Sequence, residues 1–197
     1  MAQLRGAVEM SIGFIVVIVI AVVMLSLVLS WLRGMFTGIE DLTGQMRQTA
    51  LSDLTESFQT GASGNFDISP KSYTTTSGKK LFIGVGILND AEDRKQHNFV
   101  INVDVVQQPT GVTSATVQSW IDWVKVPTPI APMFKNIDNP IPIYINLPSG
   151  AIPGIYTLRI TACYDKIVGQ ALTWETCKPG ADNMWGGTVR YFQLEVK

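Results

Sequence analysis

The chain has 197 residues, of which 46% are hydrophobic and 16% charged, and its formal net charge is −1. The charged fraction lies below the roughly 25% of an average soluble domain. With 15 basic and 16 acidic residues the chain lacks the basic excess of a nucleic-acid-binding protein, so we expect no nucleic-acid partner.

The first predicted element begins with an uncharged apolar run at residues 10–32, MSIGFIVVIVIAVVMLSLVLSWL. As a helix, this run would rise about 34 Å, enough to cross a hydrocarbon core of about 30 Å. The apolar part of a secretory signal peptide is about 7–15 residues long and ends in a small-residue cleavage site. The longer run, without such a site, predicts a retained transmembrane helix.

The helical pattern continues beyond the apolar run. Apolar residues recur at spacings of three and four, which places them on one face of a helix. They are Met35, Ile39, Leu42, Met46, Leu54 and Phe58. Such a stripe can be buried by the C-terminal domain of the same chain or by identical helices of other copies. We expect Leu54 and Phe58 to pack on the domain, and Met35, Ile39 and Leu42 to face other copies.

Glu9 stands immediately before the apolar run. A carboxylate at the edge of an uncharged span calls for a positive partner, and the amine of a newly formed N-terminus is one candidate. Alternatively, Glu9 lies among lipid headgroups at the N-terminus of the helix, where the helix dipole tolerates it.

The stretch RGAVEMSIGFIVVIVI resembles the N-terminus of type IV pilins, in particular of archaeal pilin-like proteins. The resemblance implies that a prepilin peptidase removes a short leader after Arg5 or Gly6, so that the mature chain begins at Gly6 or Ala7. It also implies that the helices pack into a filament core, with the pilus assembly machinery as a partner. Glu9, Met35, Ile39 and Leu42 would then serve assembly.

After Gly64 the sequence changes to short β-rich runs separated by turn residues. We expect strands at 66–69, 81–88, 99–105, 115–126, 141–147, 156–163, 168–174 and 192–196. This number and spacing are typical of an antiparallel Ig-like sandwich. Tyr156 follows a turn-rich segment at the start of a strand, as in the tyrosine corner of such sandwiches. The predicted fold class is α+β: a leader at 1–6, a long transmembrane or filament-core helix at 7–60, and an antiparallel Ig-like β-sandwich at 61–197.

The only two cysteines, Cys163 and Cys177, lie 14 positions apart in the strand-rich region. A zinc site would need further ligands, and the sole histidine, His97, is remote in sequence. A disulfide formed in an oxidising compartment is favoured over two buried thiols.

The sequence contains no motif of a catalytic or metal site. His97 lies in the charged stretch NDAEDRKQHNF, which predicts a solvated hairpin loop and no catalytic triad. Asp90, Glu92 and Asp93 lack the spacing of a calcium-binding EF-hand. Four tryptophans either form a carbohydrate-stacking surface or belong to the core and to interfaces; they are Trp120, Trp123, Trp174 and Trp185. We therefore expect no enzyme, cofactor or metal, and keep glycan contact as a secondary hypothesis.

The leading hypothesis is a structural subunit of a cell-surface pilus-like filament, with the helix in the core and the sandwich outside, serving adhesion or surface attachment. The alternative is a single-pass membrane protein that does not polymerise and carries an extracellular binding or scaffolding sandwich. Both hypotheses give the chain a membrane partner and place the sandwich outside the cell, and the first adds copies of the chain itself.

Overall fold

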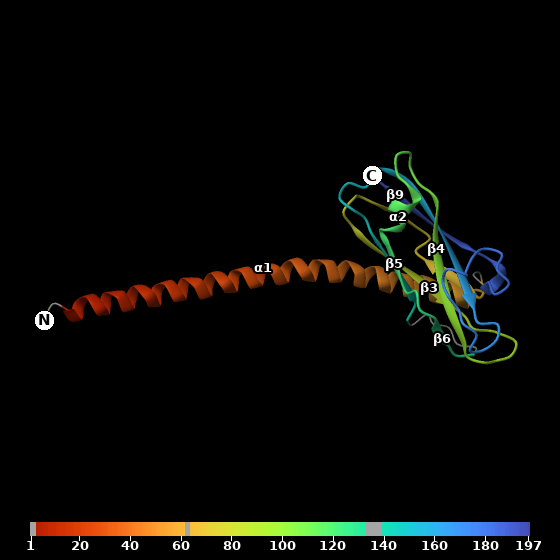
Figure 1. The fold of residues 1–197 in the computed structure, drawn as a ribbon, viewed down its shortest axis with the longest axis horizontal. Coiled ribbons are helices and arrows are strands. Elements are labelled where there is room, and N and C mark those ends of the chain that lie inside the picture. The colour runs from red at the N-terminus through yellow and green to blue at the C-terminus, as the bar shows by residue number, and fades with distance from the viewer. Residues whose placement is uncertain (1–2, 62–63, 133–138) are drawn as a thin grey trace. The chain divides into compact units, whose positions relative to one another are not determined.

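The computed structural model describes the backbone of residues 3–61, 64–132 and 139–197, and within these ranges the side chains of 13–29 and of 44 onward. The chain divides into two units, Met1–Leu42 and Thr43–Lys197. Helix α1 (Gln3–Gln59) makes up the described part of the first unit and continues into the second (Figure 1).

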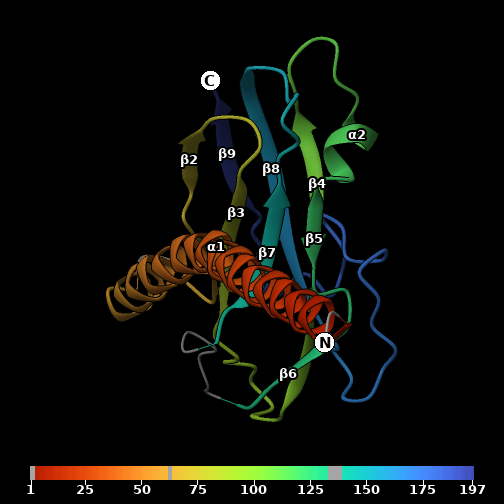
Figure 2. The same cartoon turned by 90° about the vertical axis from the view of Figure 1, so that its left-hand side faces the viewer.

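The second unit contains two β-sheets (Figure 2). The four-stranded sheet has the order β1 (Phe66–Ser69), β3 (Lys80–Ile87), β7 (Ile141–Asn146) and β5 (Ile121–Trp123). The five-stranded sheet has the order β2 (Ser72–Thr75), β9 (Arg190–Val196), β8 (Gly154–Tyr164), β4 (His97–Gln107) and β6 (Thr128–Ile130). A short helix, α2 (Ser114–Gln118), precedes β5, and a 3-10 turn, η2 (Trp185–Gly187), precedes β9.

Alternate residues of both sheets form one apolar core. Ile83 and Val85 of β3 and Phe99 and Ile101 of β4 are completely buried in it. Tyr156 also lies in this core, and its hydroxyl donates a hydrogen bond of 2.7 Å to the carbonyl oxygen of Ile152. This bond to the backbone just upstream is the one that a tyrosine corner makes.

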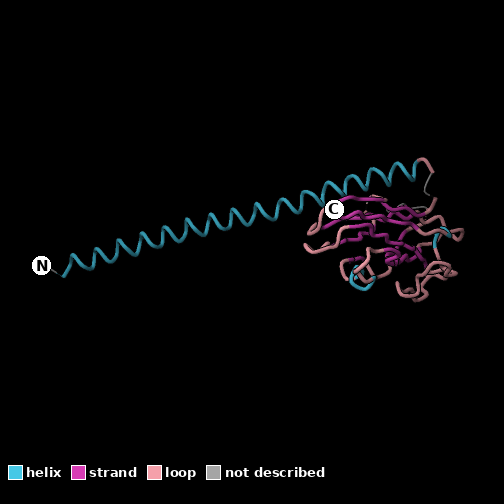
Figure 3. The backbone as a smooth tube through the Cα atoms, turned by 90° about the horizontal axis from the view of Figure 1, so that it is seen from above, coloured by secondary structure: helices cyan, strands magenta, loops and turns pink. Residues whose placement is uncertain are grey.

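The last turns of α1 lie alongside the strands of the second unit (Figure 3), and their side chains pack on β3 of the four-stranded sheet. Ala50, Leu54 and Phe58 are buried there, which confirms the expectation that Leu54 and Phe58 pack on the C-terminal domain. The sheet meets this helix with two glycines of β3. A Cβ atom on Gly86 would lie 2.6 Å from Cε2 of Phe58, and one on Gly84 would lie 3.4 Å from Cβ of Ala50. Residues without side chains therefore allow the close approach of helix and sheet.

Two hydrogen bonds join the same helix to the edge strand β1. The Ser57 hydroxyl donates to Oδ2 of Asp67 at 2.6 Å, and the Ser69 hydroxyl donates to Oδ2 of Asp53 at 2.7 Å. Asp67 and Ser69 are buried, so these bonds satisfy polar groups that the helix removes from water. The helix is thus bonded to one face of the edge strand through the side chains of Asp67 and Ser69.

The predicted fold class is wrong in two respects. The sandwich is not wholly antiparallel, because β2 and β9 run parallel while every other pairing of the described strands is antiparallel. The transmembrane helix is not supported either: within the described part of the chain, no helix combines the length and the apolar character needed to cross a membrane.

Two of the predicted strands are also wrong. The segment 115–126 begins with α2, because Thr113 caps the helix by accepting a hydrogen bond of 3.2 Å from the Thr116 amide, and only Ile121–Trp123 is extended. The segment 168–174 forms turns in place of a strand, with Gly169 in the left-handed region at φ 86°. Strands β2 and β6 were not expected.

We expect Gly86→Ala to lower the free energy of unfolding by about 1–3 kcal/mol, because its methyl group would overlap Phe58 and overpack the helix–sheet contact. Urea unfolding of the full chain, followed by tryptophan fluorescence, measures this. Gly150→Ala is the matched control, since a Cβ there meets nothing within 4 Å. Equal unfolding free energies for the two variants would contradict the proposed role of Gly86.

Candidate functional site

Among the described side chains, the longest run of exposed large apolar residues is segment 13–29 of α1. Every residue of the segment except Gly13, Ala21 and Ser26 carries a large apolar side chain, and these side chains are 47–67% exposed. No face of the segment is polar, whereas the surface helix of a globular protein is polar on the side facing water. The segment therefore needs a partner that covers it on all sides.

None of the predicted assembly and processing residues has a side chain in the described part of the structure. Arg5, Gly6, Ala7, Glu9, Met35, Ile39 and Leu42 have side chains that lie outside the described residues. Their assignment to leader cleavage and assembly stays a prediction.

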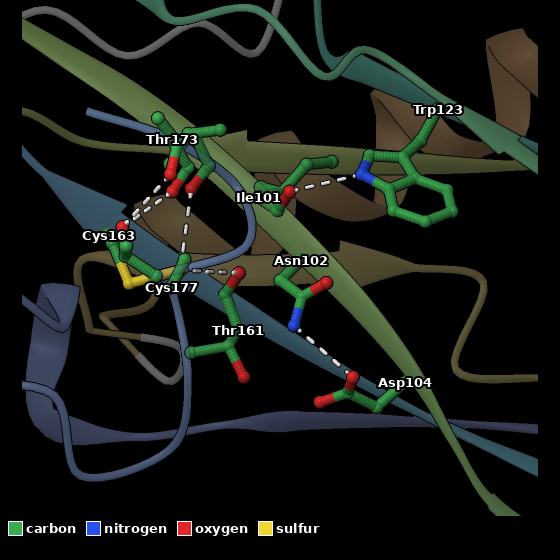
Figure 4. Close-up of a disulfide and its surroundings, with 10 residues drawn as sticks. Ile101, Asn102, Asp104, Trp123, Thr161, Cys163, Thr173 and Cys177 are labelled. Atoms are coloured by element: carbon green, nitrogen blue, oxygen red, sulfur yellow. Dashed lines mark hydrogen bonds between the residues drawn. A yellow bond between two sulfur atoms is a disulfide. The ribbon is translucent and has the colours of Figure 1, made fainter. Parts of the chain in front are cut away.

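The disulfide expected from the sequence is present. Cys163, in β8, is bonded to Cys177, in the connection between β8 and β9, and their Cα atoms are 5.6 Å apart (Figure 4). Both cysteines are fully buried, and they pack with Val100 and Leu172 in a second, smaller apolar cluster. The bridge fastens the β8–β9 connection onto the face of β4 and β8 opposite the main core.

The four tryptophans do not gather on one open surface. Trp123 and Trp185 are buried, and their indole N–H groups donate to backbone carbonyl oxygens, that of Trp123 to Ile101 at 3.1 Å (Figure 4). Trp120 packs on Tyr156 and Trp174 on Trp123, each pair with ring centres 5.6 Å apart. All four therefore contribute to interior packing.

The one cluster of buried titratable side chains in the described unit is centred on His97. The expected solvated loop is wrong at this position: His97 is the first residue of β4, and its side chain is 1% exposed. Its Nδ1 lies 2.8 Å from the carbonyl oxygen of Asp165 and 2.9 Å from that residue's Oδ1. Its Nε2 lies 2.9 Å from Oδ1 of Asp93. Asp93 and Asp165 come from different segments, the β3–β4 loop and the end of β8.

These contacts determine the charge of the ring. A carbonyl oxygen can only accept, so Nδ1 carries a proton. Oδ1 of Asp93 also accepts a hydrogen bond of 3.2 Å from the Lys95 amide, so this oxygen faces Nε2 as an acceptor and Nε2 carries a proton as well. At pH values below its raised pKa, His97 is an imidazolium held between two carboxylates.

Burial and hydrogen bonding oppose each other in this cluster. Burial alone would lower the pKa of His97, but the hydrogen bonds to Asp93 and Asp165 outweigh it and raise the pKa above the ordinary 6.5. Burial alone would raise the pKa of Asp165, yet hydrogen bonds, the strongest from Asn98, hold it below its usual value. The hydrogen bond from His97 lowers the pKa of Asp93.

A pocket of about 510 Å³ lies beside this cluster. Its lining includes Asp90, Glu92 and Asp93 of the β3–β4 loop on one side and Tyr164, Lys166 and Trp185 on the other. A doubly protonated imidazole has no lone pair to act as a base, and no serine or cysteine lines the pocket. Within the described ranges, no three histidine, cysteine or carboxylate side chains are placed to hold a metal ion. The contacts of His97 pair this strand residue with Asp93 of the β3–β4 loop and with Asp165, which follows β8.

Sequence reasoning missed the His97 cluster for an identifiable reason. The spacing of four between Asp93 and His97 is visible, but Asp165 is 68 positions away from His97. Only the pairing of β4 with β8 brings it there.

No protein-family model and no curated protein matches the chain. Among solved structures, it is similar to a family 123 glycoside hydrolase from Clostridium perfringens, with 13% identity and a TM-score of 0.42 over 64% of this chain and 23% of that one. It is also similar to a structure from a chaperone–tip adhesin complex of CFA/I fimbriae, with 9% identity and a TM-score of 0.35 over 66% of this chain and 55% of that one. The chain thus spans less than two thirds of the length of either, and at these TM-scores neither likeness supports an inference about fold or function.

We expect the free energy of unfolding to decline as the pH rises above about 6.5. The folded-state pKa of His97 is raised, so its stabilising contribution is complete below the unfolded pKa and is lost as the pH rises through the folded pKa. His97→Gln should remove this part of the decline. Urea unfolding of both proteins from about pH 5 to about pH 9 tests this, and identical slopes would show that His97 is not the titrating group.

We expect the double variant Cys163→Ala, Cys177→Ala to lose about 3 kcal/mol of unfolding free energy, the chain-entropy value for a loop of this length. Urea unfolding measures the loss. Adding a reductant should lower the stability of the wild type only, because the variant has no bond to break. Non-reducing peptide mapping that finds both thiols free in the native protein would contradict the disulfide itself.

Proposed function

We propose that this protein is a non-enzymatic structural subunit of a pilus-like filament at the cell surface. In this proposal the apolar segment 13–29 packs against the same segment of neighbouring copies, and the β-sheet unit is displayed to the outside. The observation that carries the proposal is the exposure, on every face, of an unbroken apolar helical segment.

The amount of exposed apolar surface argues for several neighbours. Soluble monomers rarely expose contiguous apolar patches of more than a few hundred Å². A two-stranded coiled coil buries only the a and d positions of each helix, which would leave the remaining apolar faces of 13–29 in water. A bundle of many copies covers them all. The motif RGAVEMSIGFIVVIVI, with its resemblance to type IV pilins, supports the same assembly.

The proposed location outside the cell is supported by the disulfide between Cys163 and Cys177, because such bonds persist in oxidising compartments. Prepilin peptidase and the assembly machinery are proposed partners on the resemblance alone. The mass of the native N-terminus tests this part: a start at Gly6 or Ala7 supports processing, and a retained Met1 contradicts it.

We expect Val22→Asp to abolish assembly, because a carboxylate in the middle of the apolar segment would be buried without a partner among the neighbouring helices. The measurement is the amount of high-molecular-weight assembly in sheared surface fractions. Gln48→Asp is the matched control, since it adds the same charge to an exposed position of the same helix outside the segment. The urea unfolding of the β-sheet unit should be the same in both variants.

Cysteines introduced singly at positions 35, 39 and 42 extend the test to the predicted assembly residues. Cross-linked dimers and larger species are expected in the wild-type background, and their loss is expected with Val22→Asp. If all three positions give monomers only, the filament proposal is wrong.

A further inference from the structure

The loop between β3 and β4, residues 89–96, has an ordered polar framework. The fully buried Asn89 side chain anchors its base: Nδ2 donates to the carbonyl oxygens of Ile130 at 2.7 Å and Lys95 at 3.0 Å, and Oδ1 accepts from the Ala91 amide at 3.3 Å. Nearer its end, Arg94 has a φ of 53°, in the left-handed region that residues other than glycine rarely adopt. This part of the loop therefore depends on contacts that hold it in place.

Asp93 supplies such a contact. Its Oδ1 accepts hydrogen bonds from the Lys95 amide, within the loop, and from Nε2 of His97, in the sheet. The side chain of Asp93 is 38% exposed, so it can turn into water without opening the core.

Asp165, the other carboxylate on His97, cannot leave in this way. It is fully buried, and its oxygens accept from the amide and the side-chain nitrogen of Asn98, each at 2.8 Å. The two sides of the His97 contact are therefore unequal: one is fixed and the other is free to detach.

Loss of one proton from His97 affects its contact with Asp93. Nδ1 faces two acceptor oxygens of Asp165, so a neutral ring keeps its single proton there. The lone pair of Nε2 then faces Oδ1 of Asp93 across 2.9 Å with no proton between them. Two acceptors cannot hold this contact, and Asp93 turns away.

The charged groups around the ring come from both sides. Asp93 shares its loop with the carboxylates Asp90 and Glu92 and with the cations Arg94 and Lys95, and the charge of Lys95 helps to lower the pKa of Asp93. On the side of β8, the titratable groups near the ring are Tyr164, with its ring centre 5.4 Å from that of His97, and Lys166, which lines the adjoining pocket.

We propose that the Asp93–His97 contact is a pH-operated tether, which holds the 89–96 loop in place while His97 is protonated and releases it in alkaline medium. Release widens the pocket that the loop lines and exposes its opposite wall, formed by Tyr164 and Trp185. The surface presented by this end of the β-sheet unit thus changes with the pH of the medium.

The first test uses the fact that His97 is the sole histidine of the chain, so its ring signals need no assignment. Nitrogen-15 NMR of the full chain in mild detergent should show a doubly protonated ring at about pH 6 and the Nδ1–H tautomer after titration. A ring that is already neutral at about pH 6, or that titrates to the Nε2–H tautomer, overturns the proposal.

The second test measures tryptic cleavage after Arg94 and Lys95 in the full chain. At about pH 7, Asp93→Ala should be cleaved about tenfold faster than the wild type, as expected for loss of one charge-assisted hydrogen bond. Glu92→Gln is the matched control, because it removes a charge from the same loop but leaves the tether, and it should behave like the wild type. Equal rates for Asp93→Ala and Glu92→Gln overturn the proposal.

A third variant separates the tether from a general effect of pH. In Asp93→Asn the side-chain amide can accept from a protonated Nε2 and donate to a neutral one, so the tether persists at both pH values. Relative to a reference peptide of the same sequence, wild-type cleavage should accelerate as His97 titrates, while Asp93→Asn stays slow. An acceleration of Asp93→Asn equal to that of the wild type overturns the proposal.

Discussion

The packing of residues 50–58 of α1 on Gly84 and Gly86 of β3 determines how the β-sheet unit is closed. One face of β3 lies in the core between the two sheets, and this helix covers the other, which is why seven of its eight residues are buried. The same close approach brings the Ser57 hydroxyl to the buried Asp67 of the edge strand, where it donates a hydrogen bond to Oδ2. A side chain at Gly86 would separate helix and sheet, and it would expose both the strand and its polar contacts to water.

At the end of the apolar core, the polar contacts of His97 join the β3–β4 loop to the segment that follows β8. His97 lies at the end of the row of buried core residues formed by Phe99 and Ile101. It is the first residue of β4 and contacts Asp93 in the preceding loop. Its charge is stabilised because two segments each bring a carboxylate, one rigid and one exposed. Burial of a charge normally weakens a fold unless it is paired and hydrogen-bonded. Here the pairing also makes the position of one loop sensitive to proton concentration.

Much of the β-sheet unit could be predicted from the sequence, and the exceptions have physical reasons. The alternation of β9 marks a strand with one buried face, and the turn before Tyr156 marks the start of β8. The sequence of β4 alternates in the same way, but the structure buries all of residues 99–103, because the disulfide cluster covers the second face. The uninterrupted apolar run LFIGVGIL indicates a strand covered on both faces, and its glycines indicate a close neighbour. Neither feature shows that this neighbour is helix α1. The polar β2 and its parallel pairing with β9 depend on contacts 121 positions apart, which no local pattern contains.

The two parts of α1 whose side chains are described illustrate why a helical pattern alone does not identify a partner. At 44–59 the apolar residues form one stripe, and a single sheet surface of the same chain buries Ala50, Leu54 and Phe58. At 13–29 apolar side chains point in all directions, so one flat surface would leave most of them in water. Burial of a Val, Leu or Ile side chain is worth about 1.5–3 kcal/mol, and over such a segment the sum far exceeds the net stability of a typical domain. The width of the apolar face, more than its hydrophobicity, therefore distinguishes a helix segment that one sheet surface can bury from a segment that one sheet surface leaves mostly exposed.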